Sequence, residues 1–173
     1  MAHVASEFIP VSVAVLTVSD SRGEAEDTSG HYLVEAANAA GHRIADKRII
    51  KDNLYQIRSV VSAWIADDSI QAIVINGGTG FTEHNHTPEA LLPLFDREVE
   101  GFGELFRMLS YEDIGTSTIQ SRAIAGLANK TIIFAVPGST SACKMAWERI
   151  ITEQLDARHR PCNFLPHLGK KQR

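Results

Sequence analysis

Three glycines follow a short apolar run and form the most informative chemical feature of this chain. Gly77, Gly78 and Gly80 come directly after Ala72–Ile75, in the order Asn-Gly-Gly-Thr-Gly. Glycine accepts positive φ values, and backbone N–H groups that lead into a helix attract a phosphate or a carboxylate. The loop lacks the Gly-Lys-Ser/Thr of a Walker A motif and the spacing of a dinucleotide-binding fingerprint. It therefore indicates either an anion-binding loop or an ordinary tight turn.

Carboxylates near the predicted turns could hold a cation, and these are Asp20, Asp27, Asp52 and Glu83. Mg²⁺ prefers oxygen ligands and serves phosphoryl chemistry, so Asp20 and Asp52 are candidate ligands. Each carboxylate also has a structural interpretation. Asp27 precedes Thr28-Ser29-Gly30 and is expected to cap a helix, and Asp52 could cap the next helix.

Other reactive side chains favour structural roles. His84 and His86 flank Asn85. Such a pair can bind zinc, but no third ligand stands at a recognisable spacing, so a zinc site is the weaker interpretation. Ser19 and Ser139 do not lie in a nucleophile elbow, and no histidine can be assigned to either as a base.

Alternating strands and helices must position these groups. The sequence predicts strands over Val11–Val18, Arg43–Ile50, Ala72–Ile75, Ala123–Leu127 and Thr131–Val136. Ala128-Asn129-Lys130 predicts a hairpin between the last two strands, so at least one pair is antiparallel. Apolar residues at helical spacing predict helices over Leu33–Ala40, Leu54–Ile65, Phe102–Met108 and Ala142–Ile150. This alternation indicates an α/β layered fold with a mostly parallel sheet.

Three predicted turns follow strands and precede helices: Ser19–Arg22, Asn76–Asn85 and Pro137–Ser139. In open α/β folds, ligands bind outside the carboxyl ends of the strands. If the strands are parallel, the three turns meet at one edge, which is the predicted site. Thr87 is expected to cap a short helix that Pro93 shortens.

Composition favours one globular domain. The chain has 173 residues, of which 44% are hydrophobic and 22% charged, and its net charge of -4 argues against a dedicated nucleic-acid binder. No apolar run is long enough for a membrane span, and Met1–Pro10 lacks the features of a signal peptide. Cys143 and Cys162 predict free thiols in the cytoplasm. We expect a single domain over 1–173, with a core over about 10–157 and a basic, extended tail over 158–173.

Three motifs, in this order, resemble the molybdopterin-binding (MoaB/Mog) domain family. They are Thr17-Val18-Ser19-Asp20-Ser21-Arg22, Gly77-Gly78-Thr79-Gly80 followed by Thr87-Pro88-Glu89-Ala90, and Val136-Pro137-Gly138-Ser139. Leu91–Gly103 and Ile114–Arg122 are similar to the MoaB branch, and the resemblance covers Pro10–Leu168. It implies a three-layer αβα sandwich with a mostly parallel, mixed central sheet. It also implies a homotrimer or homohexamer, molybdopterin as ligand, and a part in molybdenum cofactor biosynthesis.

The resemblance assigns roles to single residues as well. It implies that the pterin is bound by Ser19, Asp20, Gly77, Gly78, Thr79, Gly80, Thr82, Pro137, Gly138 and Ser139. Active members adenylylate molybdopterin with ATP and Mg²⁺, and Asp52 matches one catalytic aspartate. The second catalytic aspartate is replaced by Asn85, which removes one negative charge from the Mg²⁺ site expected around Asp20 and Asp52. Metal affinity is therefore expected to fall, while pterin binding is retained.

Three functions remain open. The first is a molybdopterin adenylyltransferase, or a weak relic of one, which Asp20 and Asp52 favour. The second is a non-catalytic pterin-binding or carrier protein, which Asn85 favours, and the third is an oligomeric scaffold whose site is unused. An apolar cluster is predicted to support a closed oligomer and consists of Phe102, Phe106, Met108 and Leu109.

Overall fold

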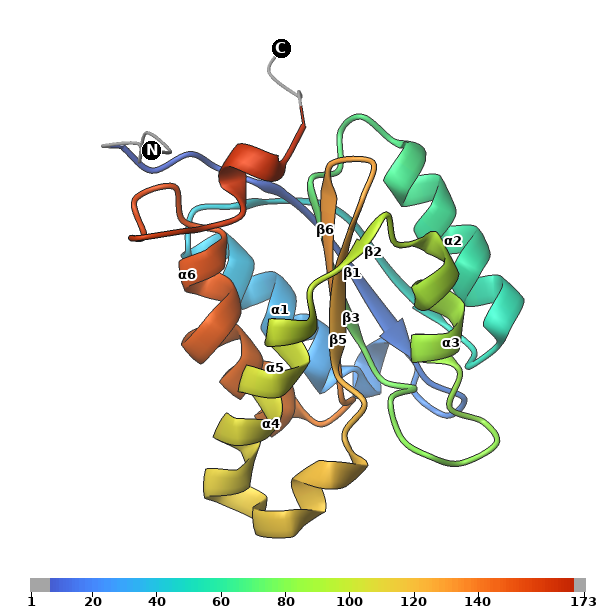
Figure 1. Cartoon of the computed structure of the whole chain (residues 1–173). Helices are drawn as coiled ribbons and strands as arrows, with labels where there is room; N and C mark the ends of the chain where they lie inside the picture. Colours follow the sequence, from blue (N-terminus) through green and yellow to red (C-terminus); the bar gives the residue numbers. More distant parts are fainter. Residues whose placement is uncertain (1–6, 170–173) are drawn as a thin grey trace.

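A six-stranded sheet lies at the centre of the fold, in the order β2-β1-β3-β6-β5-β4 (Figure 1). The structure is a computed structural model and describes residues 7–169. Its strands are β1 (Ser12–Val18), β2 (Arg43–Ile50), β3 (Ala72–Asn76), β4 (Arg97–Glu98), β5 (Ile124–Ala128) and β6 (Thr131–Val136). Neighbouring strands from β2 to β6 pair in parallel, whereas β5 is antiparallel to both β6 and β4. The mostly parallel, mixed sheet is thereby confirmed.

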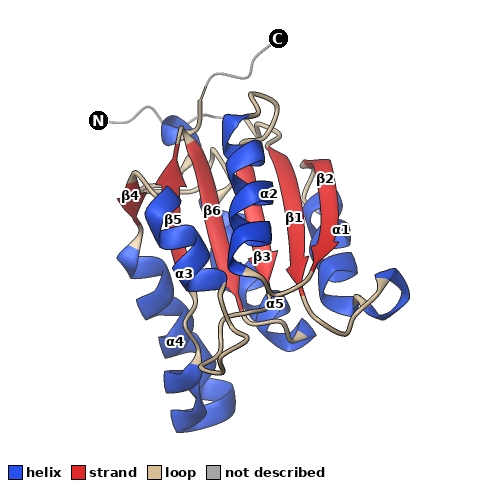
Figure 2. Cartoon of the chain, turned by 90° about the vertical axis from the view of Figure 1, so that its right-hand side faces the viewer, coloured by secondary structure: helices blue, strands red, loops and turns tan. Residues whose placement is uncertain are grey.

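Helices cover both faces of this sheet (Figure 2). One face is covered by α1 (Thr28–Ala39), α4 (Glu100–Ile114) and α5 (Thr140–Ala146), and the other by α2 (Leu54–Ala66) and α3 (Thr87–Leu91). Successive residues of β1 supply both apolar cores, because side chains alternate between the faces of a strand: Val13 and Val15 pack with α1, and Ala14 and Leu16 with α2. The three-layer αβα sandwich is confirmed.

The chain reverses between β5 and β6 in the predicted hairpin. Asn129 and Lys130 both have positive φ, 46° and 62°, as the two central residues of a type I′ turn require.

α4 is longer than predicted, since it continues past Met108 to Ile114 and into the 3₁₀ helix η3 (Gly115–Gln120). Beyond α5, the chain continues through a π-helical turn over Trp147–Ile151 and the short helix α6 (Thr152–Gln154).

The prediction that Thr87 caps α3 is wrong. The helix begins at Thr87 itself, with His86 in the N-cap position. The Thr87 hydroxyl instead donates to the carbonyl oxygen of Gly77 at 2.8 Å, so it serves the glycine loop. α3 has five residues and gives way to a 3₁₀ turn over Leu92–Leu94, which confirms the shortening expected from Pro93.

The cluster predicted for subunit contacts belongs mostly to the core of one chain. Phe102, Phe106 and Leu109 are buried on the inner face of α4, and the Phe102 ring lies 5.1 Å from that of Phe134 in β6. Only Met108 of that cluster is exposed, at 61%. Helical periodicity explains this result, because residues 102, 106 and 109 share one face and residue 108 does not.

The tail is not extended over the part that the structure describes. Leu165–His167 form a 3₁₀ turn, and the Phe164 ring packs edge-on against Phe134 in the core. The Gly169 N–H donates to the carbonyl oxygen of Lys130 at 3.0 Å, next to the β5–β6 turn.

Residues 1–6 and 170–173, at the two ends of the predicted single domain, lie outside the described residues. Within the described part, no helix combines the length and apolarity that crossing a membrane requires.

Candidate functional site

A cleft with a volume of about 450 Å³ lies at the carboxyl ends of β1, β3 and β6. The three predicted turns meet here, because their strands are adjacent and parallel. Its walls include eight of the residues that the sequence singled out, namely Ser19, Gly77, Gly78, Thr79, Gly80, Asn85, Pro137 and Gly138. Asp20, Asp52, Thr82 and Ser139 are not among the residues that line it.

The glycine loop needs its first two glycines for its own backbone path. Gly77 and Gly78 have φ values of +97° and +70°. A Cβ on Gly77 would lie 2.1 Å from the carbonyl oxygen of Val18, and one on Gly78 would lie 2.2 Å from the hydroxyl oxygen of Thr87. The loop is therefore pressed against β1 and α3, and no larger residue fits at either position.

Three backbone N–H groups of this loop are left without a partner by the rest of the described chain. Gly78, Thr79 and Gly80 line the cleft, and their N–H groups have no acceptor among the described residues. Consecutive backbone N–H groups in a glycine turn form a concave donor surface that favours anions. The loop thus has the chemistry of an anion-binding site.

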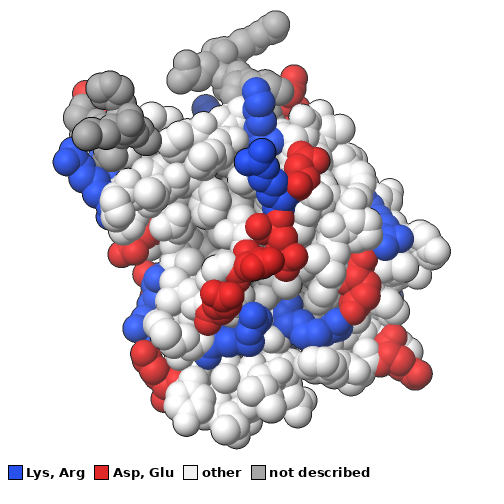
Figure 3. Space-filling view, in the orientation of Figure 1, with Lys and Arg blue, Asp and Glu red and all other residues white. Residues whose placement is uncertain are grey.

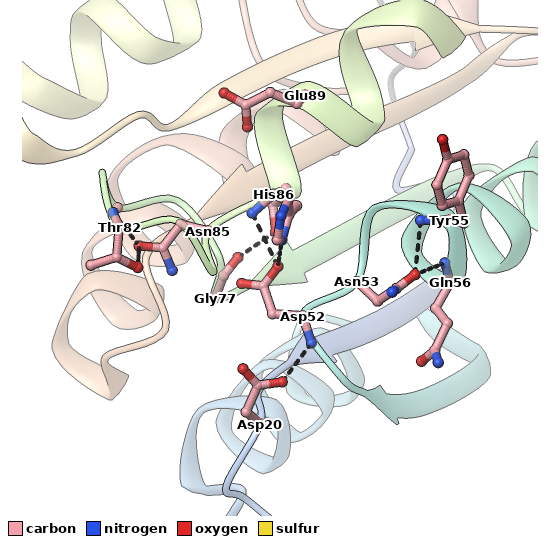
Figure 4. Close-up of polar contacts among 12 residues, drawn as sticks. Asp20, Asp52, Asn53, Tyr55, Gln56, Gly77, Thr82, Asn85, His86 and Glu89 are labelled. Atoms are coloured by element: carbon pink, nitrogen blue, oxygen red, sulfur yellow. Dashed lines mark hydrogen bonds and ion pairs between the residues drawn. The ribbon is translucent and has the colours of Figure 1, made fainter.

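Asp52 lies behind this loop (Figure 4). Its side chain is 6% exposed, and its Oδ1 accepts hydrogen bonds from both the backbone N–H and Nδ1 of His86, each at 3.0 Å. Its backbone N–H donates to Oδ1 of Asp20 at 3.0 Å. Asp52 does not cap α2, because Asn53 accepts from the first N–H groups of that helix. Asp20 and Asp52 are thus brought together, as predicted from their places after β1 and β2. Their hydrogen bonds have a structural role, because they join the loops after β1 and β2 to each other and to the start of α3.

Asn85 and Thr82 form a tight turn within the glycine loop. The amide Oδ1 of Asn85 accepts from the backbone N–H of Thr82 at 3.1 Å and from its hydroxyl at 2.8 Å. Thr82 is exposed, and its polar groups are used in this turn. Asn85 lines the cleft, so it is the member of the pair that a ligand would meet.

Arg122, to which the sequence interpretation gave no role, clamps the same loop. Its guanidinium donates to the carbonyl oxygens of Gly80 and Asn85 and pairs with Glu89 of α3. It also lies 5.1 Å over the ring of Phe81. Burial raises the pKa of Glu89, but the hydrogen bond to Arg122, a backbone hydrogen bond and the nearby positive charge together outweigh burial, so that pKa is lowered overall. No motif indicated this clamp, because it joins residues 33 to 42 positions apart.

Arg22 holds the third turn in place and faces the cleft. Its Nη1 donates to the carbonyl oxygen of Gly138 at 2.7 Å, and the Ser29 hydroxyl donates to the same oxygen at 2.7 Å. Ser139 is the N-cap of α5, where its hydroxyl accepts from Ala142 N–H. Among the described residues that line the cleft, Arg22 is the only charged one. Arg22 is the last residue of the motif Thr17–Arg22, but its residue type alone did not predict the contact with Gly138.

A buried carboxylate supports the cleft from beneath. Asp27 caps α1 as predicted, accepting from Gly30 N–H at 2.9 Å. It is fully buried, accepts the Thr17 hydroxyl at 3.0 Å, and is paired with Lys47 at 3.1 Å. Burial lowers the pKa of Lys47, but the hydrogen bonds to Glu24 and Asp27 and the charges of these carboxylates together outweigh burial and raise it overall. The charge of Asp27 is thus compensated, as a buried ion requires.

The far wall of the cleft comes from α4 and η3. It consists of Ile114, Ser117, Gln120 and Ser121. Ser121 Oγ is buried without a partner among the described residues. The sequence interpretation left this stretch unassigned because it has no clear periodicity.

Comparison with known proteins adds to this geometry. The sequence pattern of a family described as "Probable molybdopterin binding domain" matches residues 14–157, which include the strands and loops that form the cleft. The chain belongs to this family. The motifs that first indicated the resemblance therefore lie within the matched range, and several of their residues line the cleft.

Individual relatives agree with the family. The chain is 67% identical over 170 residues to molybdenum cofactor biosynthesis protein B of Escherichia coli (strain K12), covering 98% of this chain and 100% of that protein. It is 44% identical over 146 residues to the protein of the same name from Bacillus subtilis (strain 168), covering 84% and 86%. These similarities place this member of the family in molybdenum cofactor biosynthesis.

Solved structures share the fold. A crystal structure of a molybdenum cofactor biosynthesis protein B superposes with a TM-score of 0.83 at 40% identity, covering 85% of this chain and 92% of that one. The tungsten cofactor synthesizing protein MoaB from Pyrococcus furiosus gives a TM-score of 0.74 at 34% identity, covering 83% and 92%.

The carboxylates that would hold the Mg²⁺ implied by adenylylating members of the family lie outside the lining of the cleft. Asp20 and Asp52 each use Oδ1 as a hydrogen-bond acceptor, and Asn85 Oδ1 accepts twice. In the described part of the chain, no group of three or more His, Cys, Asp or Glu side chains is placed to hold a metal ion. The lining of the cleft includes no carboxylate. The donor set is that of an anion site.

Proposed function

We propose that the cleft binds molybdopterin, with its phosphate held by hydrogen-bond donors and its pterin ring held between apolar walls. The observation that carries this proposal is the set of open N–H groups on Gly78, Thr79 and Gly80, which share a cleft with the guanidinium of Arg22. Such donors suit a phosphate. Val18 and Ile114 offer apolar surface to a ring.

A titration of native protein with molybdopterin tests this proposal. We expect saturable binding, and Arg22→Gln should weaken it about tenfold, because it removes a charge-assisted donor from the cleft. Arg43→Gln is the matched control, since Arg43 is exposed at the first residue of β2, away from the carboxyl edge. Equal affinity in the two variants would contradict the proposed site.

A second candidate function is adenylyl transfer to molybdopterin from ATP with Mg²⁺, which the contact between Asp20 and Asp52 favours. Pyrophosphate release from molybdopterin, ATP and Mg²⁺ distinguishes it from a carrier function. The binding site supports the carrier more directly, so we expect native release to be slow. Asn85→Asp should raise it, and a tenfold gain corresponds to ~1.4 kcal/mol of transition-state stabilisation. Asp52→Ala in that background should abolish the gain.

We also propose that the protein works as a trimer or hexamer in the cytoplasm. Both cysteines are free, which suits a reducing compartment. The support for assembly is apolar surface on α4 and η3, where Leu105, Met108, Tyr111, Ile114 and Ile119 are exposed. Figure 3 shows that this end of the molecule carries few charges.

A further inference from the structure

The side-chain amide of Asn85 has a fixed orientation. A backbone N–H group can only donate, so the Asn85 atom that meets Thr82 N–H at 3.1 Å must be the amide oxygen. The Thr82 hydroxyl binds the same oxygen at 2.8 Å. The amide nitrogen Nδ2 therefore points away from Thr82, on the side of Gly77 in Figure 4.

The surroundings of Asn85 hold this orientation. Arg122 donates to the carbonyl oxygen of Asn85 at 3.0 Å and to that of Gly80 at 2.6 Å, so both ends of the turn are fixed. A Cβ on residue 80 would lie 2.6 Å from Asn85 Oδ1, so Gly80 leaves space for the amide oxygen. Asn85 lines the cleft, and Nδ2 has no acceptor among the described residues. Nδ2 is thus a side-chain donor that the described residues leave unused.

The cleft contains only one kind of charge. Arg22 is positive, and no carboxylate is among the described residues that line the cleft. Asp52 is not among the lining residues; its Oδ1 is engaged by His86, and its Oδ2 lies next to Gly78. A divalent cation would therefore meet donors and a positive charge, whereas an anionic oxygen would meet complementary groups.

We propose that Asn85 makes this cleft bind a phosphate-bearing ligand without a divalent cation. Its Nδ2–H donates directly to an anionic oxygen, at the place where a carboxylate would attract a cation instead. This inference rests on the proposed molybdopterin site and adds the ionic requirement of that site. It also makes residue 85 the position that decides between cation-independent and cation-dependent binding.

Asn85→Asp tests the role of that one atom. Aspartate has nearly the same shape, so one carboxylate oxygen can keep both hydrogen bonds from Thr82. The other oxygen then replaces Nδ2 and puts a negative charge beside the ligand phosphate. Asn85→Ala is the comparison variant, because it removes the donor and adds no charge.

The experiment is a titration with molybdopterin in two buffers, one with EDTA and one with Mg²⁺. The native affinity should agree in the two buffers within about twofold, and Asn85→Ala should weaken binding several-fold but equally in both. Asn85→Asp should bind at least about tenfold more weakly in EDTA, and Mg²⁺ should restore much of that loss. A second measurement uses Mn²⁺ alone, followed by electron paramagnetic resonance, and should detect tighter Mn²⁺ binding by Asn85→Asp than by the native protein.

The outcomes separate the two proposals. Native binding that is lost in EDTA and restored by Mg²⁺ would overturn this inference and leave the proposed function standing. Native protein that binds no molybdopterin in either buffer would overturn both. The native comparison decides the matter even if Asn85→Asp does not fold.

Discussion

Asp52 and His86 show how one hydrogen-bonded pair can fasten a loop. The carboxylate is nearly buried, and both hydrogen bonds to its Oδ1 come from His86 at the start of α3. Since a buried carboxylate without partners is costly, this pair keeps the glycine loop closed against the end of β2.

We expect His86→Ala to lower the free energy of unfolding by about 1–3 kcal/mol, because it removes one hydrogen bond from a buried charged acceptor. Urea denaturation measures the change. His84→Ala is the matched control, since the His84 side chain is 71% exposed and contacts only the exposed Glu83. Equal destabilisation by the two variants would contradict the role given to His86.

A second residue makes stability depend on pH. Burial lowers the pKa of His42, and the charge of Asp156 offsets this only in part. The folded state therefore binds this proton less readily than the unfolded state does, so stability should fall as pH drops below about 6.5 towards the lower folded value. Unfolding free energies at pH 7 and pH 5 measure this. His42→Asn, which removes the titrating group, should show a smaller loss, and an equal loss would exclude His42.

The role of a candidate residue could be predicted from the sequence where the residue type and its immediate neighbours determine its backbone conformation or its cap. Gly77 and Gly78 were recognised because only glycine suits their backbone path, and Asp27 because a helix cap depends on neighbouring residues. The orientation of Asn85 was not predictable, since it depends on the geometry of the turn with Thr82. A sequence gives the atoms of an amide but not which one faces a ligand.

At the scale of elements, the clamp between the glycine loop and α3 decides how rigid the cleft is. Arg122 leads into β5 and reaches across to Gly80, Asn85 and Glu89 with a planar fork of donors. The loop is thereby joined to the antiparallel part of the sheet, because β5 begins next to the carboxyl end of β6.

Arg122→Gln should loosen the loop and weaken molybdopterin binding about tenfold, because the loop must then be ordered by the ligand. Hydrogen exchange of peptides over residues 77–86 should be faster than in the native protein. Arg122→Lys should not restore the native rate, since an ammonium cannot make these forked contacts. Unchanged exchange in Arg122→Gln would show that the loop does not depend on the clamp.

Strands and helices were largely predictable, but some of their ends were not. β2 begins and ends at the predicted residues, and the apolar runs of β1, β3 and β6 gave the central strands. The start of α3 was wrong by one residue because a partner 34 positions away, Asp52, accepts the His86 N–H. The end of α4 was missed because its last turns face outward and carry no apolar pattern.

For the whole molecule, the exposed apolar surface of α4 and η3 is the feature that supports the proposed oligomer. Ile119 is 72% exposed, and Met108, Tyr111 and Ile114 are exposed beside it. Of the four residues predicted to form an apolar contact surface on α4, only Met108 is exposed, since the direction of each side chain depends on how the helix packs on β6.

We expect light scattering to give a mass of three or six chains for the native protein. Ile119→Asp should shift the mass towards a single chain, because it places a charge in a buried apolar contact. Glu104→Asp, which keeps the charge of an exposed residue on the adjoining helix α4, is the control. A native mass of 19.0 kDa, that of one chain, would exclude the oligomer.

The cleft is assembled from segments that are far apart in the chain, and this has a kinetic consequence. Asn76 reaches back 60 residues to Leu16, and Gly77 N–H forward to Val136, so the walls meet only after β1, β3 and β6 have paired. Parallel pairings of this span form slowly because long loops must close first. Ligand capture during refolding should therefore appear in the slowest phase, after most helical structure has formed. A nascent chain would therefore acquire its binding site only once β6 had been synthesised.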